Sequence, residues 1–290
     1  MQTKNKITLI ISFLSLFIIN TNLYAEEFNI SASEITIDKE NNIVAGKGNV
    51  EITDADGIVI KSKEVIYETS KEFLTLEGSV QIFDTDGNIL NTTKATYDKI
   101  NEIIISYENS ELILAEGYKL KTDSILYDVE KKIVSSEQNT IFKDIDNNTV
   151  ETSMFQYQIE KNLFSSIGKV KIIDVNKNRY FFKELYIDTE KKEMIGSDVS
   201  VLFDQENFGV SKESDPRLVA NDILMTTNES SLSKAVFTVC KKKGNECPPW
   251  TLQAKKIKHD KIKKTIYYDN AVLKVYDIPV FYFPKFFHPD

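Results

Sequence analysis

The chain has 290 residues, of which 41% are hydrophobic and 28% are charged, a composition typical of a folded globular protein rather than a disordered one. This length suits one large domain or two of modest size. The formal net charge of −8 argues against a general nucleic-acid-binding protein, which would present a basic face, although a local basic stripe could still meet an anionic ligand.

The amino terminus has the features of an export signal. Lys4 and Lys6 give it a positive start, residues 7–19 are mostly apolar, and the small residue Ala25 stands at the expected cleavage site. These features predict a secretory signal peptide over residues 1–25, with an uncleaved anchor as the alternative. The apolar run is shorter than a membrane-spanning helix needs. We therefore expect an exported protein that ends up in, or beyond, the periplasm.

A repeat of 30 residues organises the chain from about Glu34 to Gln205. Four registers keep their chemical character through six copies without an insertion. Two of them, two residues apart, are Ile37, Tyr67, Tyr97, Tyr127, Tyr157, Ile187 and Ile35, Val65, Ala95, Ile125, Phe155, Leu185. A third is apolar throughout and a fourth is acidic with one exception: Ile52, Ile82, Leu112, Phe142, Ile172, Leu202 and Asp54, Asp84, Leu114, Asp144, Asp174, Asp204. A period of this length that holds its register predicts a repeat architecture.

Each repeat alternates apolar and polar residues with period two, as at Val50 and Ile52 or Val80 and Ile82, which is typical of half-buried β-strands. Turn residues recur about every 15 positions, so one repeat comprises two strands of about ten residues and two short turns. We therefore expect an all-β fold, an open antiparallel β-jelly roll or V-shaped two-sheet sandwich built from 30-residue hairpin repeats. A parallel β-helix is less favoured, because its coils have no reason to turn back at half the period.

The turns Asp54–Gly57 and Asp84–Gly87 have residues in common with calcium loops. We favour a structural role, because Asp caps tight turns through its side chain, Gly supplies positive φ, and no bidentate Glu follows at the spacing of an EF-hand. Gly46–Gly48 lacks the length and the Ser or Thr of a phosphate loop, and indicates the end of a strand. The tyrosine register is either a cross-strand ladder in a sealed core or the lining of an open one.

The regular register ends after Gln205. Residues 209–216 are polar and predict a linker or loop. We expect a periplasmic β-jelly-roll repeat domain over residues 26–210 and a diverged β segment over residues 211–290. Residues 276–290 are rich in aromatic residues and prolines, and little chain remains to pack against them. This composition predicts that the segment continues into further chain.

The only two cysteines, Cys240 and Cys247, lie in the diverged segment. In an exported protein they predict a disulfide with each other, and pairing with cysteines in a segment absent here is the alternative. His259 and His288 do not stand at the spacing of metal ligands, so no metal site is expected.

Two groups of motifs carry a resemblance to a known family. The first is the Gly-x-Val punctuation of the repeats, at Gly48-Asn-Val50, Gly78-Ser-Val80 and Gly168-Lys-Val170, together with their Tyr-Asp pairs. The second comprises Val236-Phe-Thr-Val-Cys240, Cys247-Pro-Pro-Trp250, Ala254-Lys-Lys-Ile257, Ile266-Tyr-Tyr-Asp-Asn270, Pro279-Val-Phe-Tyr-Phe-Pro284 and His288-Pro-Asp290. With both groups, the chain resembles the lipopolysaccharide-assembly proteins of the outer membrane (the LptD family), over their periplasmic OstA-like domain up to the start of the barrel. Sister periplasmic proteins share the first group.

The resemblance implies lipopolysaccharide (LPS) transport and assembly at the periplasmic face of the outer membrane of a Gram-negative cell. A periplasmic LPS-bridge protein would add its end strand to the open sheet edge, and acyl chains would slide along an apolar groove toward the barrel. The barrel, which is absent from this chain, would contact an outer-membrane lipoprotein that plugs it. The resemblance implies no catalysis, no cofactor and no nucleic-acid partner. It also implies disulfides between the periplasmic domain and the barrel as another option for Cys240 and Cys247.

We expect the inward registers to line the lipid-binding groove: Ile35, Ile37, Ile52, Val65, Tyr67, Ile82, Leu112, Ile125, Tyr127, Phe142, Phe155 and Tyr157. An ordinary sealed core is the alternative for each of them. The alternative function is a free-standing soluble periplasmic LPS-bridge or chaperone protein of the same superfamily. A secreted repeat enzyme, such as a polysaccharide lyase or hydrolase, is disfavoured, because the carboxylates recur in turns instead of converging on one cleft.

Overall fold

The computed structural model describes residues 28–241 and 248–290 of the chain. The predicted signal peptide, residues 1–25, and Cys247, the predicted disulfide partner of Cys240, lie outside the described residues. Within the described ranges, no helix has the length and apolar character that crossing a membrane requires. These ranges are almost entirely β-strand, as predicted, and include a short 3-10 helix, η2 (Ile159–Lys161).

The strands, in chain order, are β1 (Phe28–Ser31), β2 (Glu34–Asp38), β3 (Ile43–Asp54), β4 (Val59–Glu68), β5 (Phe73–Phe83), β6 (Ile89–Asp98), β7 (Ile103–Ile113), β8 (Lys119–Asp128), β9 (Ile133–Ser136), β10 (Thr140–Lys143), β11 (Thr149–Thr152), β12 (Phe155–Gln158), β13 (Leu163–Ile173), β14 (Arg179–Asp188), β15 (Glu193–Leu202), β16 (Arg217–Met225), β17 (Glu229–Thr238), β18 (Trp250–Asp260), β19 (Thr265–Val275) and β20 (Ile278–Pro289).

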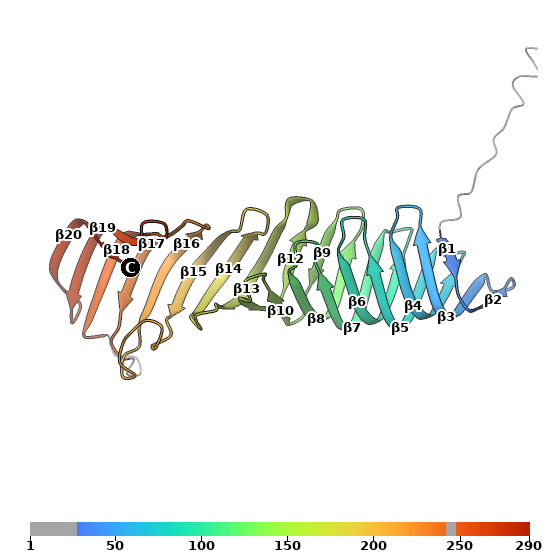
Figure 1. The fold of residues 1–290 in the computed structure, drawn as a ribbon, viewed down its shortest axis with the longest axis horizontal. Helices are drawn as coiled ribbons and strands as arrows, with labels where there is room; N and C mark the ends of the chain where they lie inside the picture. The colour runs from blue at the N-terminus through green and yellow to red at the C-terminus, as the bar shows by residue number, and fades with distance from the viewer. Residues whose placement is uncertain (1–27, 242–247) are drawn as a thin grey trace, which may run out of the picture.

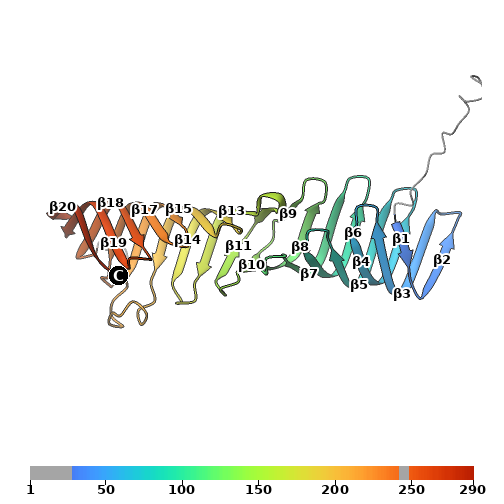
Figure 2. The same cartoon turned by 45° about the horizontal axis from the view of Figure 1, so that its top comes forward.

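These strands form one continuous antiparallel meander, in which most strands pair with their neighbours in sequence. At one end β1 and β2 both pair with β3, and in the middle β8 pairs with β9 and β10 while β13 pairs with β11 and β12. Figures 1 and 2 show a long body with β1 and β2 at one end and β20 at the other. The antiparallel order confirms the predicted hairpins and excludes the parallel β-helix.

The long strands carry β-bulges near their middle. The pairing register shifts between Lys47 and Val50 and again, one repeat later, between Glu77 and Val80. Gly78 lies in the second shift with φ +80°, a conformation that side chains other than glycine rarely adopt. Because a bulge sets two residues against one, it bends the strand and increases its twist.

The bends fold each strand back over the interior. A straight strand of ten residues would hold its two ends about 33 Å apart. Here opposite ends meet: Tyr97, at the end of β6, donates a hydrogen bond over 2.9 Å to Oδ2 of Asp54, which ends β3 at the other row of turns. Two sheet halves therefore face each other around one interior, and the predicted open antiparallel jelly roll is confirmed.

Alternate strand positions fill this interior. In β5, for example, Leu74, Leu76, Val80 and Ile82 are buried, and the residues between them are exposed or half-buried. The apolar positions of the two-residue period are therefore the buried ones in this strand. Strand pairing continues from β15 to β16 across the loop at residues 203–216, so the sheet itself crosses the predicted domain boundary at residue 210.

Candidate functional site

The strand ends form two rows of turns. We call the first the Asp-turn row; it comprises residues 54–57, 84–87, 114–117, 144–147 and 174–177. We call the second the opposite row; it includes residues 69–72, 99–102, 129–132, 159–162 and 189–192 and continues at 226–228 and 261–264. In the first turn, Oδ1 of Asp54 accepts hydrogen bonds from the amides of Asp56 and Ile58 over 3.0 and 2.8 Å. The predicted turn-capping role of these aspartates is confirmed. In the part of the chain that the structure describes, no cluster of acidic, His or Cys side chains is arranged to hold a metal ion.

Side chains from the two rows meet across the interior and tie the rows together. The first tie joins the turn at 54–57 to the turn at 99–102. Tyr97 donates hydrogen bonds to Asp54 over 2.9 Å and to Glu102 over 3.0 Å. Lys99 lies 2.5 Å from Asp56 and 2.6 Å from Glu102, and is itself buried. We call each such link between the rows a clasp.

Burial and the neighbouring carboxylates together set the protonation states in this first clasp. It raises the pKa of the Tyr97 hydroxyl, and the negative charges of Asp54 and Glu102 raise it further, so the phenol stays neutral and donates. For Lys99, burial alone would lower the pKa, but the hydrogen bonds to Asp56 and Glu102 and the charge of Asp54 outweigh it and raise the pKa. The ammonium therefore stays charged among its carboxylates.

Two more clasps follow along the body. In the second, Lys132 pairs with Asp86 over 2.9 Å, and the Tyr127 hydroxyl lies 3.5 Å from Asp84. In the third clasp, Leu114 stands at the register of Asp54 and Asp84, so other side chains make the link.

In this third clasp, the Tyr118 hydroxyl donates a hydrogen bond to the backbone oxygen of Thr189 over 3.1 Å. The Tyr157 hydroxyl lies 3.3 Å from the side-chain hydroxyl of Thr189. Together the three clasps link the two rows from the turn at residues 54–57 to the turn at residues 189–192.

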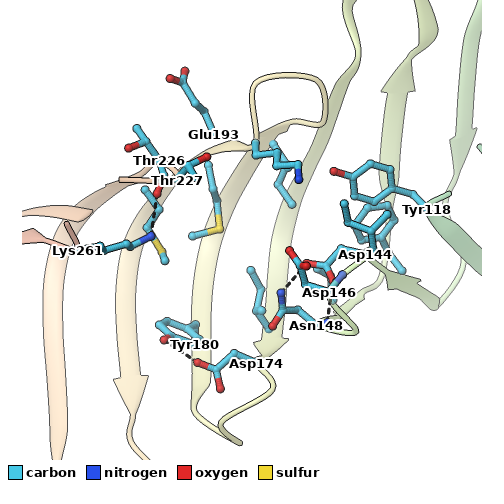
Figure 3. A pocket seen from close by; sticks show the side chains of 18 residues that line it. Tyr118, Asp144, Asp146, Asn148, Asp174, Tyr180, Glu193, Thr226, Thr227 and Lys261 are labelled. Atoms are coloured by element: carbon cyan, nitrogen blue, oxygen red, sulfur yellow. Dashed lines mark hydrogen bonds between the residues drawn. The ribbon is translucent and has the colours of Figure 1, made fainter. Parts of the chain in front are cut away.

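Beyond the third clasp the two rows separate, and a cavity of about 420 Å³ lies between them. One wall comes from the Asp-turn row at residues 144–146, 148 and 174, and the other comes from the opposite row at residues 192, 226, 227 and 261. Figure 3 shows Asp144 and Asp146 on one side and Thr226 and Lys261 on the other. The volume is within the range of about 300–1,000 Å³ that small-molecule sites occupy.

The cavity has an apolar floor and a polar rim of both charges. The floor includes Phe142, Val150, Ile172, Ile187, Met194 and Met225. The rim includes Asp144, Asp146, Asp174, Lys192, Glu193 and Lys261. Such a site suits a ligand that is apolar over most of its length and polar at one end.

Several rim groups already have partners. Oδ1 of Asp144 accepts hydrogen bonds from the amides of Asp146 and Asn148 over 2.9 and 2.8 Å, so this oxygen caps its own turn, as Oδ1 of Asp54 does in the first clasp. The Lys261 ammonium donates to the backbone oxygen of Thr226 over 2.7 Å, and burial lowers the pKa of Lys261.

The predicted groove residues divide into two groups. Nine are buried in the interior: Ile52, Val65, Ile82, Leu112, Ile125, Tyr127, Phe142, Phe155 and Tyr157. Phe142 belongs to the lining of the cavity, whereas Ile82, Leu112, Ile125 and Tyr127 border a gap of only about 10 Å³. A space of that size is at the lower limit for one water molecule. In this state the interior is tightly packed near β5–β8 and open near β14–β16.

The remaining three lie toward the β1–β2 end. Tyr67 is half-buried and packs edge-on against Phe28. Ile35 and Ile37 lie on β2 with 45% and 63% of their surface exposed, so the structure does not bring them inside. The physical reason is that, among the described residues, β2 pairs with β3 alone, so its second edge has no strand partner to complete the interior. Whether any of the twelve contacts lipid stays a prediction.

Sequence reasoning missed most of the cavity. Met194, Met225 and Lys261 come from strands and turns that lie close to or beyond the end of the regular register, where spacing no longer locates an inward face. One signal was present, because the tyrosine register changes to Ile187 in the repeat where the cavity begins.

The fold and the cavity define a class of protein, an antiparallel jelly roll with an apolar interior that opens on one side. A family model described as OstA-like protein matches residues 19–116, the amino-terminal third of the chain. Among solved structures, the chain is similar to LptH from Pseudomonas aeruginosa, described as the LptA-homologous periplasmic component of the conserved lipopolysaccharide transport device. That similarity has 17% sequence identity and a TM-score of 0.35, and covers 37% of this chain and 79% of the other. No curated protein matches the chain.

Proposed function

We propose that this protein is an exported periplasmic component of LPS transport that carries the acyl chains of LPS inside its jelly roll. The observation that carries the proposal is the 420 Å³ cavity, whose apolar floor continues the buried inward registers and whose rim is polar. The OstA-like match over residues 19–116 supports the same class of function.

The physical basis of such transport is the burial of methylene groups. Each methylene taken out of water contributes about 0.8 kcal/mol, so an interior of Ile, Leu, Val, Phe and Tyr side chains can hold an acyl chain without any chemical step. Because the inward registers repeat along the body, a chain that moves by one repeat meets a similar surface. The lipid can then advance without one position that holds it tightly.

The finer proposal is that the chain is the periplasmic domain of an outer-membrane LPS-assembly protein. In that case the bridge protein adds a strand at one end of the sheet, and the segment after β20 leads to a barrel that contacts a plug lipoprotein. The motifs between Cys240 and Asp290 support this version. Cys240 would then pair with Cys247 or with a cysteine of the barrel.

A free-standing LPS bridge is the second candidate. The specific observation in its favour is that the sheet has an exposed edge at both ends, at β1 and β2 and at β20, as strand addition on both sides would require.

Site-specific photocrosslinking in cells tests the common proposal. A photoreactive residue replaces Met194 or Phe142, which line the cavity, or their chain neighbours Ile195 or Ile141, which are exposed on the outer face. We expect LPS adducts at the two inward positions and none at the two outward ones. Well-folded variants that form no adduct at either inward position would contradict the proposal.

A further inference from the structure

The tyrosine–aspartate pairs of the first two clasps share one spacing, and residue pairs at that spacing continue further along the chain. Tyr97 and Asp54 are 43 residues apart, and so are Tyr127 and Asp84. The next pair at this distance that keeps the aspartate is Ile187 with Asp144, in which isoleucine has no hydroxyl to donate.

The ion pair of the second clasp is also missing there. Lys132 and Asp86 are 46 residues apart and bonded, and Lys192 and Asp146 stand at the same separation. Among the ion pairs of the described residues, none joins Lys192 to Asp146, although both side chains line the cavity. Neither link of the second clasp therefore joins the turn at residues 144–147 to the turn at residues 189–192, and the cavity lies between these two turns.

The same repeat differs at the strand bend. In earlier repeats a buried threonine and a buried serine face each other there, as in the hydrogen-bonded pair Thr122 and Ser136. Two repeats later, Phe182 and Gly196 stand at the same register. A Cβ atom added to Gly196 would lie 2.4 Å from the ring of Phe182, so the ring fills the space that a larger residue would need. Three registers thus depart from the repeat together, which points to a specialised segment rather than to a single chance substitution.

We propose that the gap between Ile187 and Asp144 is a lateral port, through which a linear acyl chain passes between the interior of the jelly roll and its surroundings. The port rests on the proposed function for the identity of its ligand. Its position follows from the chain itself: the third clasp, at Thr189, forms its closed border, and Met194 and Met225 provide a flexible apolar floor just inside.

A gain-of-clasp variant tests the port. Ile187→Tyr places a phenol at the register of Tyr97 and Tyr127, which contact aspartates of the Asp-turn row. Ile187→Phe adds the same ring without the hydroxyl. The probe is dansyl-undecanoic acid, a fluorescent acyl chain, mixed with the purified full chain in stopped flow. One hydrogen bond to a carboxylate shifts an open–closed equilibrium by about tenfold or more. We expect the association rate to fall by roughly tenfold in Ile187→Tyr and by less than about threefold in Ile187→Phe.

Two results would overturn the port. One is an unchanged association rate in Ile187→Tyr, with a thermal midpoint at least equal to that of the parent chain showing that the variant is folded. The other is an equal decrease in the two variants, because bulk and not the tie would then be responsible. Failure of the proposed function has a different signature: the parent chain would form no LPS adduct at Met194 in cells, whatever the two variants do with the probe.

Discussion

At the scale of single residues, the first clasp is a buried network of hydrogen bonds and ion pairs. Lys99 is surrounded by Asp54, Asp56 and Glu102, and Tyr97 donates to two of these carboxylates. Leaving a buried carboxylate without its donor costs more than the bond itself contributes, because the desolvated charge stays behind. The members of the first clasp therefore depend on one another.

Tyr97→Phe should lower the free energy of unfolding by about 1–3 kcal/mol, because it removes the donor to Asp54 and Glu102 without changing the ring. Urea denaturation measures this loss. Tyr107→Phe is the matched control, since Tyr107 is an exposed tyrosine on the neighbouring strand β7. Equal stability of the two variants would show that the clasp contributes nothing.

The first clasp should also give the protein an alkaline limit. The pKa values of Tyr97 and Lys99 are both raised in the folded state. Their stabilisation is therefore fully present below the unfolded-state pKa values of about 10 and is lost as the pH rises above them toward the folded-state values.

Unfolding free energies measured from about pH 8 to about pH 11 should fall more steeply for the parent chain than for the double variant Tyr97→Phe, Lys99→Met. Parallel curves would exclude these two groups as the cause. Other buried tyrosines, such as Tyr127, remain in both proteins. Burial also raises the pKa of Tyr127, so these tyrosines contribute equally to the pH dependence of the two unfolding free energies.

At the scale of elements, the bulges convert flat hairpins into a folded-over sheet. A bulge leaves carbonyl groups without a strand partner, and buried hydroxyls supply the missing donors. Thr92, for example, donates to the backbone oxygens of Lys94 and Tyr107 over 3.2 and 2.8 Å. At the corresponding bend of β14 and β15, the ring of Phe182 lies over Gly196 instead, and packing takes over from hydrogen bonding.

Gly196→Ala should destabilise the protein by about 1–3 kcal/mol, because the new methyl group would overlap the ring of Phe182. The backbone at Gly196 does not have a positive φ, so the overlap alone causes the loss. A thermodynamic cycle with Phe182→Leu checks this explanation. The double variant should recover part of the loss, and strict additivity of the two substitutions would exclude direct contact as the cause.

At the scale of the whole molecule, one sheet runs through the described residues, and its terminal strands β1, β2 and β20 are each paired on one side only within these residues. The strand β20 is exposed along nearly all of its 12 residues, and Phe281 and Phe287 have 61% and 67% of their surface exposed. A long apolar edge strand is a template for pairing with another strand. The molecule is thus suited to be one segment of a longer β-structure.

The double variant Phe281→Lys, Phe287→Lys should reduce concentration-dependent self-association of the purified chain, because charges on an edge strand oppose pairing with a second strand. Sedimentation velocity over a range of protein concentrations measures this effect. Ile100→Lys is the matched control, since Ile100 is an exposed apolar residue in a turn away from both ends. If the control has the same effect, general surface hydrophobicity and not the edge strand drives association.

Spacing and residue type alone predict the class of fold, the 30-residue hairpin unit, the turn positions and the apolar registers of most strands. These are local properties: a two-residue period reports which face is buried, and Asp and Gly at fixed spacing specify turns such as Asp54–Gly57. The sequence also held the break in the tyrosine register at Ile187.

The consequence of that break follows from contacts between distant parts of the chain. The clasp partners are 43 or 46 residues apart in the first two clasps, and Tyr118 and Thr189 of the third are 71 apart, while no local pattern states how far a bulge folds a strand over. Nor could spacing show that Ile35 and Ile37 lie exposed on a terminal strand while Met225 and Lys261 reach the cavity. A closed interior near β6 and an open one near β15 arise from contacts between distant repeats, and such contacts exist only once the chain has folded over itself.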